Sequence, residues 1–510
     1  MEASREDHVA FWKVLATALR EADPLTKALG RAMSGLTGTP WEGVCQGAIR
    51  RLEGGATLSQ TLAEFGDLFD ARILAAVTAG EEDGVLEVQA QRIADALAAG
   101  DLGALSPGRG EAAADAETKE VIEYVSNLVR DAIERCASDI HLQPCEGEGG
   151  RVRLRVDGVL YEHDRLAGGR YAEVVARLKV MAALDTAERR LPQDGRILLE
   201  REGERYDLRL STIPVVGGER VVCRLLARQN IPLGLDSVGL GADDLALVRQ
   251  FCHLPSGMVI VNGPTGCGKT TVLYSMLMEA NREACCVLTV EDPVEVTFEG
   301  LSQMQIRPAV GLTFARAIRS MLRQDPDVIM VGELRDLEMM QICVQVALTG
   351  HLLLTTLHAS TSVGAIRRLI DCGLEPFLIN STLQGVITPR LVRMLCTKCR
   401  RPCGPPPEHS LPPEAARILA ALPEATFYEP VGCDECHGTG HRGRTGIYEV
   451  LTMDDRIRRA VARPVDMAAL SNAARAAGMK TMLADGLEKA ARGITSVREV
   501  VRVVPTERYA

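Results

Sequence analysis

A glycine-rich segment that ends in lysine and threonine is the part of this sequence with the clearest chemistry. An apolar run, MVIVN at 258–262, leads directly into it, and a helical pattern follows. Glycines let consecutive backbone N–H groups surround phosphate oxygens, and the amino end of the following helix adds positive potential. The segment therefore predicts a binding site for the phosphates of a nucleotide. Its residues are Gly263, Pro264, Thr265, Gly266, Cys267, Gly268, Lys269, Thr270 and Thr271.

Two side chains of this segment have individual roles in the prediction. Lys269 can reach the β- and γ-phosphates, and Thr270 offers its hydroxyl to Mg²⁺. Hydrolysis needs a further group, and the apolar run VIMVGE supplies a candidate because it ends in a carboxylate. Many ATPases have aspartate where this chain has Gly332, and Glu333 follows directly. We expect Glu333 to orient or deprotonate the attacking water.

Two other apolar runs carry polar side chains that could reach the same site. The run VLTVEDPVE contributes Glu291 and Asp292. The run HLLLTTLH begins with His351 and ends with His358. In a doubly wound parallel sheet, the carboxyl ends of the strands face the ligand crevice. We therefore expect both acids and both histidines beside the phosphates, although a histidine at a strand end is by itself more often structural.

Two CxxC pairs form the second chemical motif. Each pair makes a tight knuckle, and two knuckles place four thiolates in the tetrahedral arrangement that suits Zn²⁺. Four protein ligands leave no open position for water, so the site is expected to be structural. An iron–sulfur cluster is the competing metal group and a redox dithiol a weaker alternative, while Cys403 and His437 lie close enough to alter the ligand set. The expected ligands are Cys396, Cys399, Cys433 and Cys436.

Composition limits the class of protein. The chain has 510 residues and a mass of 55.1 kDa, which suggests about three domains. The 58 Lys and Arg residues and 68 Asp and Glu residues give a net charge of −10, which argues against a general nucleic-acid-coating protein. No apolar run approaches the ~18 residues of a transmembrane helix, and the N-terminus is not typical of a signal peptide. The 15 scattered cysteines fit a reducing cytosol better than a disulfide scaffold.

Hydrophobic periodicity and composition divide the chain into three regions and two linkers. Apolar residues recur at helical spacing in the first region, and the second mixes helices with alternating strand patterns such as RVRLRVDG. In the third, apolar runs alternate with helical patterns, as in a parallel α/β sheet. The first linker, rich in Ala, Gly and acids, is expected to be flexible. The boundaries are 1–99, 100–116 (linker), 117–229, 230–240 (linker) and 241–510, with a tetracysteine insertion at about 391–446 and a helical part at about 447–510.

The motifs and their order resemble those of one family. GPTGCGKTTVLY, VEDPVE, LRQDPDVIMVGELRD and TGHLLLTTLH resemble the Walker A, aspartate, Walker B and histidine boxes of the secretion ATPases of type II secretion and type IV pilus systems. The resemblance covers about 117–510 and implies ATP, Mg²⁺ and hexamers that assemble a pseudopilus or pilus. The expected fold is an α/β P-loop (RecA-like) ATPase domain, preceded by a smaller α+β domain and an N-terminal all-helical module.

The resemblance also assigns roles to arginines. The family's α+β domain lends arginines to the nucleotide, and by position the candidates are Arg209 and Arg224. Arg319, Arg323 and Arg335 match family arginines near the nucleotide or the subunit boundary. A guanidinium group can neutralise the charge that builds up on the transferred phosphate. The alternative for each is an ordinary surface ion pair.

The cysteine motif also matches the family. Its assembly ATPases carry a tetracysteine insertion followed by a segment similar to GHRGRTGIYEVL at 440–451. The resemblance therefore implies structural zinc, and it favours an extension motor over a retraction motor.

The front of the chain resembles a different protein. DPLTKAL, GGATLSQTL and AGEEDGVLEVQAQRIADAL look like the cytoplasmic helical module of the F-type platform protein of secretion systems. The strongest part of this match is the pattern formed by Gly80, Glu81, Gly84 and Leu86. We hypothesise that the module replaces the family's usual docking domain and pairs with a similar module on the membrane platform. The alternative is a generic helical bundle.

Together these expectations describe an ATP-hydrolysing cytoplasmic motor for a type II secretion-like system. A type IV pilus extension motor is the alternative. The resemblance implies a homo-oligomer in the form of a hexamer. It also implies inner-membrane platform proteins as partners, which hold the motor peripherally at the membrane. Nucleic acid is not expected as a partner. A nucleic-acid translocase and a non-hydrolysing ATP switch are the rivals; the acidic balance argues against the first, and Lys269 with Glu333 against the second.

Overall fold

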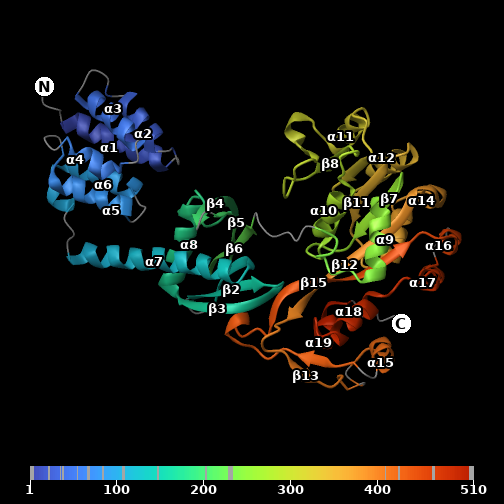
Figure 1. The fold of residues 1–510 in the computed structure, drawn as a ribbon. Coiled ribbons are helices and arrows are strands. Elements are labelled where there is room, and N and C mark those ends of the chain that lie inside the picture. The colour runs from blue at the N-terminus through green and yellow to red at the C-terminus, as the bar shows by residue number, and fades with distance from the viewer. Residues whose placement is uncertain are drawn as a thin grey trace.

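The computed structural model shows three folded units in chain order (Figure 1). None of its described helices is long and apolar enough to cross a membrane. The predicted order of an all-helical module, an α+β domain and an α/β domain is confirmed. The structure describes residues 5–20, 23, 25–34, 36, 40–53, 56–65, 69–82, 86–105, 109–145, 149–201, 204–227, 234–407, 409, 411–422, 425–461 and 466–504.

The first unit is a bundle of short helices around an aromatic core. Phe11, Trp12, Trp41 and Phe69 are buried, and their rings stack or meet edge to face. Glu81 accepts hydrogen bonds from the backbone N–H groups of Leu58 and Ser59 and thereby caps the start of a helix. Gly84 of the predicted platform-like pattern lies outside the described residues. The elements are α1 (Arg5–Arg20), α2 (Leu25–Ser34), α3 (Pro40–Glu53), α4 (Leu58–Ala63), α5 (Ala71–Glu82), α6 (Leu86–Ala99) and the 3₁₀ turn η1 (Leu102–Leu105).

Helix α7 (Arg109–Glu134) joins this bundle to the second unit and corrects one prediction. The stretch 100–116 was expected to be a flexible linker, but the backbone is already helical from Arg109. The physical reason is its content of Ala, Glu and Lys, which are strong helix formers, from 111 onward. The long blue-green helix of Figure 1 therefore takes the place of the second part of that linker, residues 109–116.

The second unit is a six-stranded antiparallel sheet covered on one face by α7 and α8 (Gly168–Met181). The strand order is β3-β2-β1-β6-β5-β4. Alternate residues of the strands, including Ile140 and Leu210, pack with Val125 and Val174 of the two helices. The strands are β1 (Ala137–Pro144), β2 (Gly149–Val156), β3 (Val159–Ala167), β4 (Gln193–Arg201), β5 (Glu204–Val215) and β6 (Gly218–Ala227).

The third unit is a seven-stranded sheet with helices on both faces. Its order is β15-β12-β7-β11-β10-β8-β9, and all neighbours are parallel except the β12–β15 pair. Successive residues of β7 enter two different cores, which explains why this strand is a continuous apolar run. The strands are β7 (Gly257–Asn262), β8 (Val287–Glu291), β9 (Ser302–Gln305), β10 (Val328–Val331), β11 (Leu352–Leu357), β12 (Leu383–Leu395) and β15 (His441–Thr452).

Helices of this unit form its two outer layers. The core on one face includes residues of α9 and α10, and the core on the other includes residues of α11 to α14, α16 and α17. A two-stranded sheet and helix α15 lie between β12 and β15 in the chain. The elements are α9 (Ala242–Cys252), α10 (Lys269–Ala280), α11 (Phe314–Met321), α12 (Leu337–Leu348), α13 (Ser362–Asp371), α14 (Pro376–Thr382), β13 (Arg401–Cys403), α15 (Pro413–Ala420), β14 (Phe427–Glu429), α16 (Asp455–Ala460), α17 (Met467–Ala476), α18 (Met482–Ala491) and α19 (Val497–Val503).

Candidate functional site

The glycine-rich loop joins β7 to α10. Gly263, Gly266 and Gly268 have φ values of 145°, 77° and 99°, which favour glycine. A Cβ atom on Gly263 would lie 2.6 Å from Sγ of Cys267, so the loop closes tightly on itself. Lys269 begins α10, and its Nζ donates to the carbonyl oxygens of Gly263 at 2.7 Å and Pro264 at 3.0 Å. Burial lowers the pKa of Lys269, and the ammonium group is held at the centre of the loop.

A cavity of about 580 Å³ opens beside this loop, a volume typical of ligand sites. It lies at the carboxyl ends of β8, β10 and β11, as expected for a doubly wound sheet. The loop, the carboxylates and one histidine are therefore brought together. The predicted residues that line the cavity are Thr265, Gly266, Gly268, Lys269, Thr270, Thr271, Glu291, Asp292, Glu333 and His358.

Glu333 lies at the centre of a small charged network on this wall. Its Oε2 is 3.4 Å from Nε2 of His358, and its Oε1 accepts a hydrogen bond from Nε of Arg335. Nη2 of Arg335 also lies 3.2 Å from Oδ2 of Asp292. The hydrogen bond to Glu333, more than any other contact, raises the pKa of Arg335. One guanidinium thus links two carboxylates that come from different strands.

Glu291 has a different environment, although it borders the same cavity. It is buried, and its oxygens accept hydrogen bonds from Thr289 Oγ1 at 2.6 Å, Gln303 Nε2 at 3.1 Å and the Tyr274 hydroxyl. Burial, followed by the hydrogen bond to Glu291, raises the pKa of Tyr274. Three protein donors already satisfy this carboxylate, so it is less available to a ligand than Asp292.

The two predicted histidines lie at opposite ends of the same strand, β11. His358 follows the carboxyl end of β11 and lines the cavity. His351 precedes the amino end, where Nδ1 lies 3.1 Å from Thr349 Oγ1 and 3.2 Å from the Val346 carbonyl oxygen. Because β11 spans roughly 20 Å at 3.3 Å per residue, both ends cannot reach one site. The expectation that His351 lies beside the phosphates of this subunit is therefore corrected.

None of the five predicted arginines lines the cavity itself; Arg335 contacts the lining residues Glu333 and Asp292, and the other four lie elsewhere. Arg209 and Arg224 are cross-strand neighbours on β5 and β6, and Nε of Arg224 donates to Oδ1 of Asp139 at 2.9 Å. Arg319 pairs with Glu338 at 3.6 Å, and Arg323 donates to the Arg319 carbonyl oxygen at 2.8 Å. A role at the nucleotide stays a prediction for these residues, and it needs a neighbouring subunit or a movement of the α+β domain.

The structure also brings residues to the cavity that sequence reasoning missed. Leu391 of β12 and Arg444 of β15 line the cavity beside the glycine-rich loop. Arg390 lies behind the loop, where it donates to carbonyl oxygens of Pro389 at 2.9 Å and Ser360 at 3.0 Å, and burial lowers its pKa. The available signal was the segment 440–451, which stood out only as the sequel to the cysteine motif.

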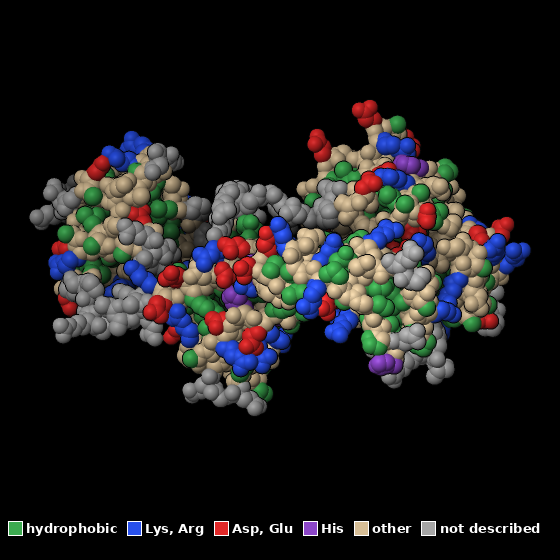
Figure 2. Space-filling model, turned by 60° about the horizontal axis from the view of Figure 1, so that its bottom comes forward, with side chains coloured by type: hydrophobic (Ala, Val, Ile, Leu, Met, Phe, Trp, Pro, Cys, Tyr) green, Lys and Arg blue, Asp and Glu red, His purple; other side chains and the backbone are tan. Residues whose placement is uncertain are grey.

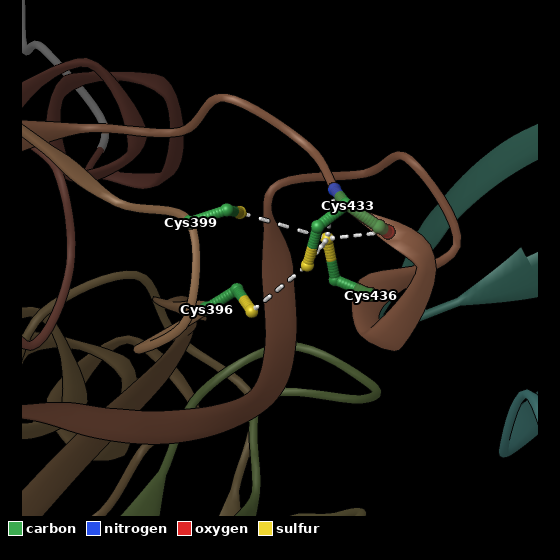
Figure 3. Close-up of side chains that lie close together, drawn as sticks. All are labelled: Cys396, Cys399, Cys433 and Cys436. Carbon is green, nitrogen blue, oxygen red and sulfur yellow. Dashed lines mark hydrogen bonds between the residues drawn. The ribbon is translucent and has the colours of Figure 1, made fainter.

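The four predicted cysteines converge from two loops (Figure 3). The Sγ atoms of Cys396 and Cys433, and those of Cys399 and Cys436, are each 3.8 Å apart. Four sulfurs at about 2.3 Å from a tetrahedral ion lie about 3.8 Å apart, so this spacing fits Zn²⁺. Within the described residues, neither Cys403 nor His437 belongs to the cluster that could hold a metal.

Backbone donors support the same cluster. The N–H groups of Gly432 and Gly440 point at Sγ of Cys399 at 3.3 Å and Cys436 at 3.2 Å. Such donors stabilise thiolate charge, as metal-bound sulfur requires. The four sulfurs and their spacing are suited to a metal ion held by four protein ligands.

Comparisons with known proteins agree with this architecture. A family model described as type II/IV secretion system protein matches residues 114–502. The type II secretion system protein E of Xanthomonas campestris is 46% identical over 390 residues, which are 75% of this chain and 67% of that protein. The type IV pilus assembly ATPase PilB of Myxococcus xanthus is 42% identical over 405 residues, which are 78% of this chain and 70% of that protein.

A solved structure supports the fold. The ATPase DotB of Legionella pneumophila superposes with a TM-score of 0.52 at 23% identity, over 74% of this chain and 94% of that one. The family match begins at residue 114, so it does not include the helical module. Since it spans most of the chain and includes both the nucleotide cavity and the cysteine cluster, this chain belongs to the family of type II/IV secretion system proteins.

Proposed function

We propose that this chain is an ATP-hydrolysing motor that powers assembly of a pseudopilus or pilus, and with it protein transport across the cell envelope. One observation carries the proposal: a single cavity is lined by both the glycine-rich loop with Lys269 and the carboxylate of Glu333, to which we assign the attacking water. A binding module that only senses nucleotide would need the first but not the second. The relatives named above are secretion and pilus assembly ATPases.

The side chains suggest how hydrolysis proceeds. The ammonium group of Lys269 exchanges its carbonyl contacts in the loop for the β- and γ-phosphates of ATP. Thr270 and Asp292 are the residues that would hold Mg²⁺, which supplies positive charge between the phosphates. Glu333 accepts a proton from water or orients it for in-line attack, while His358 and Arg335 fix its position.

Further positive charge is proposed to come from arginines outside the cavity. Arg209 and Arg224 lie on the open face of the sheet of the α+β domain, and a neighbouring subunit or a domain closure would bring them to the phosphates. The site is then complete only in an oligomer, and a closed hexameric ring is the arrangement we propose. Closure of one domain on the other would be the working movement.

The cysteine cluster is proposed to bind one structural Zn²⁺. Its four sulfurs leave no open coordination position, so the ion would stabilise the segment between β12 and β15. The ion has no proposed role in hydrolysis.

The partners are proposed to be inner-membrane proteins of a type II secretion-like system, which hold the motor at the cytoplasmic side. A type IV pilus extension motor is the alternative within the same class, since relatives of both kinds match. On the face shown in Figure 2, acidic and basic side chains are interspersed over the α+β and α/β domains. This pattern gives no support to a nucleic-acid translocase.

ATP turnover at several protein concentrations tests the proposal. We expect a rate per subunit that rises with concentration, as for a site completed by assembly, and its loss in Glu333→Gln. The matched control is Glu429→Gln, which removes an exposed carboxylate paired with Arg401 on the two-stranded sheet. Turnover that survives in Glu333→Gln would show that another group activates water.

A further inference from the structure

The contact between the α+β domain and the α/β domain includes a rigid turn. Asp157 and Gly158 join β2 to β3, and both have positive φ, 50° and 82°. A two-residue turn with both residues in the left-handed region is the tight hairpin form that matches strand twist. It presents the carboxylate of Asp157 to the neighbouring domain, where β2 and β3 approach β15 in Figure 1.

Asp157 uses both carboxylate oxygens on β15. Oδ2 accepts a hydrogen bond from the backbone N–H of Gly443 at 2.8 Å, and Oδ1 lies 3.5 Å from Nε of Arg444. The Asp157 side chain is 14% exposed, whereas that of Arg444 is 44% exposed. The carboxylate of Asp157 is thus largely removed from water and depends on these two partners. The guanidinium group of Arg444 is more exposed and can contact other groups as well.

Arg444 also forms part of the nucleotide cavity. It lines the cavity together with Gly268, Lys269 and Leu391. A guanidinium group binds phosphate and carboxylate oxygens with the same geometry, so the two kinds of partner compete for it. A triphosphate in the cavity carries more negative charge than the single carboxylate of Asp157.

A second arginine on the neighbouring strand, Arg393, also contacts the α+β domain, but its side chain has several partners. Arg393 is the cross-strand partner of Arg444, and its Nη1 donates to the hydroxyl of Tyr161 on β3 at 2.6 Å. Arg393 is also held by Glu499, with contacts of 3.1 Å from Nε and 2.8 Å from Nη2. Arg393 is therefore held by Tyr161 and Glu499, whereas Arg444 lines the nucleotide cavity.

We propose that Arg444 couples nucleotide binding to the attachment of the α+β domain. With the cavity free of triphosphate, the guanidinium pairs with Asp157 and helps to hold the β2–β3 turn on β15. When a nucleoside triphosphate binds, the guanidinium turns to the phosphates, Asp157 loses its charged partner and the turn is released. This role rests on the proposed function, because it takes a nucleoside triphosphate as the ligand of the cavity.

The coupling predicts opposite effects of two substitutions on affinity. Asp157→Asn removes the competitor, so the full-length chain should bind a non-hydrolysable ATP analogue about two- to fivefold more tightly, the range of a partly exposed ion pair. Arg444→Gln removes the phosphate contact and should weaken binding by about the same factor or more. The double variant should bind like Arg444→Gln alone. Arg401→Gln, which breaks an exposed pair with Glu429, is the matched control and should leave affinity unchanged.

Calorimetric titration measures these affinities, and hydrogen exchange gives an independent readout. In the wild type, the analogue should speed amide exchange in peptides over 155–161, and in Arg444→Gln that exchange should be fast with or without analogue. If both single variants shift affinity in the same direction, or neither shifts it, Arg444 has only a structural role and this inference is overturned. If the wild type binds no nucleotide at all, the proposed function fails as well, so the two failures are distinguishable.

Discussion

Nε2 of His358 lies 3.4 Å from Oε2 of Glu333, and the two side chains follow the carboxyl ends of adjacent parallel strands, β11 and β10. The strand register explains this contact. Val331 of β10 pairs with Thr355 of β11, so the two parallel strands end close together on the same side of the sheet. The imidazole therefore holds the carboxylate on the side opposite to Arg335. We propose that this pair positions the carboxylate that acts on the attacking water.

His358→Ala is expected to lower kcat by about 10- to 100-fold with little change in KM. The reason is that Glu333 would lose one of its two positioning contacts, and small misplacements of a catalytic group have effects of this order. Steady-state ATP turnover measures the change. His253→Ala, which removes an exposed histidine after α9, is the control and should behave like the wild type. A large rise in KM instead would assign His358 to nucleotide binding.

Metal removal tests the cysteine cluster. The protein as purified should contain about one zinc per chain, and treatment with a strong chelator should lower the Tm, because a closed four-thiolate site contributes to folding. Cys436→Ser should lose the metal, whereas Cys403→Ser should retain it, since Cys403 is not part of the cluster. Elemental analysis with thermal unfolding gives both results. Visible absorbance with iron in place of zinc would establish the iron–sulfur alternative.

Asp244 makes stability depend on pH. Burial, with repulsion from Asp485, raises the pKa of Asp244 from 3.8 to about 6 in the folded chain. The folded state therefore binds the proton more tightly than the unfolded state, and the stability gained from it is lost as pH rises from about 4 through 6. Asp244→Asn, which mimics the protonated form, should raise the Tm more at pH 8 than at pH 4.5 relative to the wild type.

The neighbouring acid provides the control for this effect. Asp243 is exposed in the same first turn of α9, so Asp243→Asn should not give the same pH-dependent gain. Thermal unfolding at the two pH values compares the variants. An equal gain for Asp244→Asn at both pH values would mean that the carboxyl group has an ordinary pKa in the folded chain.

The residues of the cavity could be predicted from the sequence where a reactive side chain comes shortly after a strand. Lys269, Glu333 and His358 each come after an apolar run, and the rule that parallel strands deliver their carboxyl ends to one crevice brings them together. His351 was misplaced because the same run has a second end at the opposite edge. Arg444 was missed because its strand is antiparallel and pairs with β12 across a long insertion, and this register cannot be read from local periodicity.

The sequence predicted the helical structure of the N-terminal module, but not the helix that connects the module to the α+β domain. Apolar spacing indicates helices α1 to α6, and the buried aromatic core agrees. The second part of the expected flexible linker, residues 109–116, is the start of α7, because helix propensity outweighed the low complexity of the stretch. A composition rich in Ala and acids fits a linker and a solvated helix equally well.

Deletion of residues 1–100 tests the hypothesis that the helical module docks the motor. The α+β and α/β domains have cores of their own, so the shortened chain should fold and retain nucleotide binding. Recruitment to membranes that contain the platform proteins should be lost. Co-sedimentation with such membranes measures it, and membranes without the platform proteins serve as the control. Unchanged recruitment would show that the module does not dock the motor at the membrane. A contact with a sister subunit would then be the remaining role.

Glu81 links the sequence pattern of this module to its stability. Its carboxylate accepts the N–H groups of Leu58 and Ser59, which have no partner within the first turn of α4. Glu81→Ala should therefore lower the free energy of unfolding of the module by about 1–2 kcal/mol. Glu64→Ala, which removes a carboxylate in an exposed pair with Arg51, should cost only about 0.2–1 kcal/mol.

Chemical unfolding of the full chain, followed by the fluorescence of Trp12 and Trp41, reports on this module because both tryptophans of the chain lie in its core. Equal effects of the two substitutions would mean that the carboxylate of Glu81 contributes no more to the stability of the module than an exposed ion pair does.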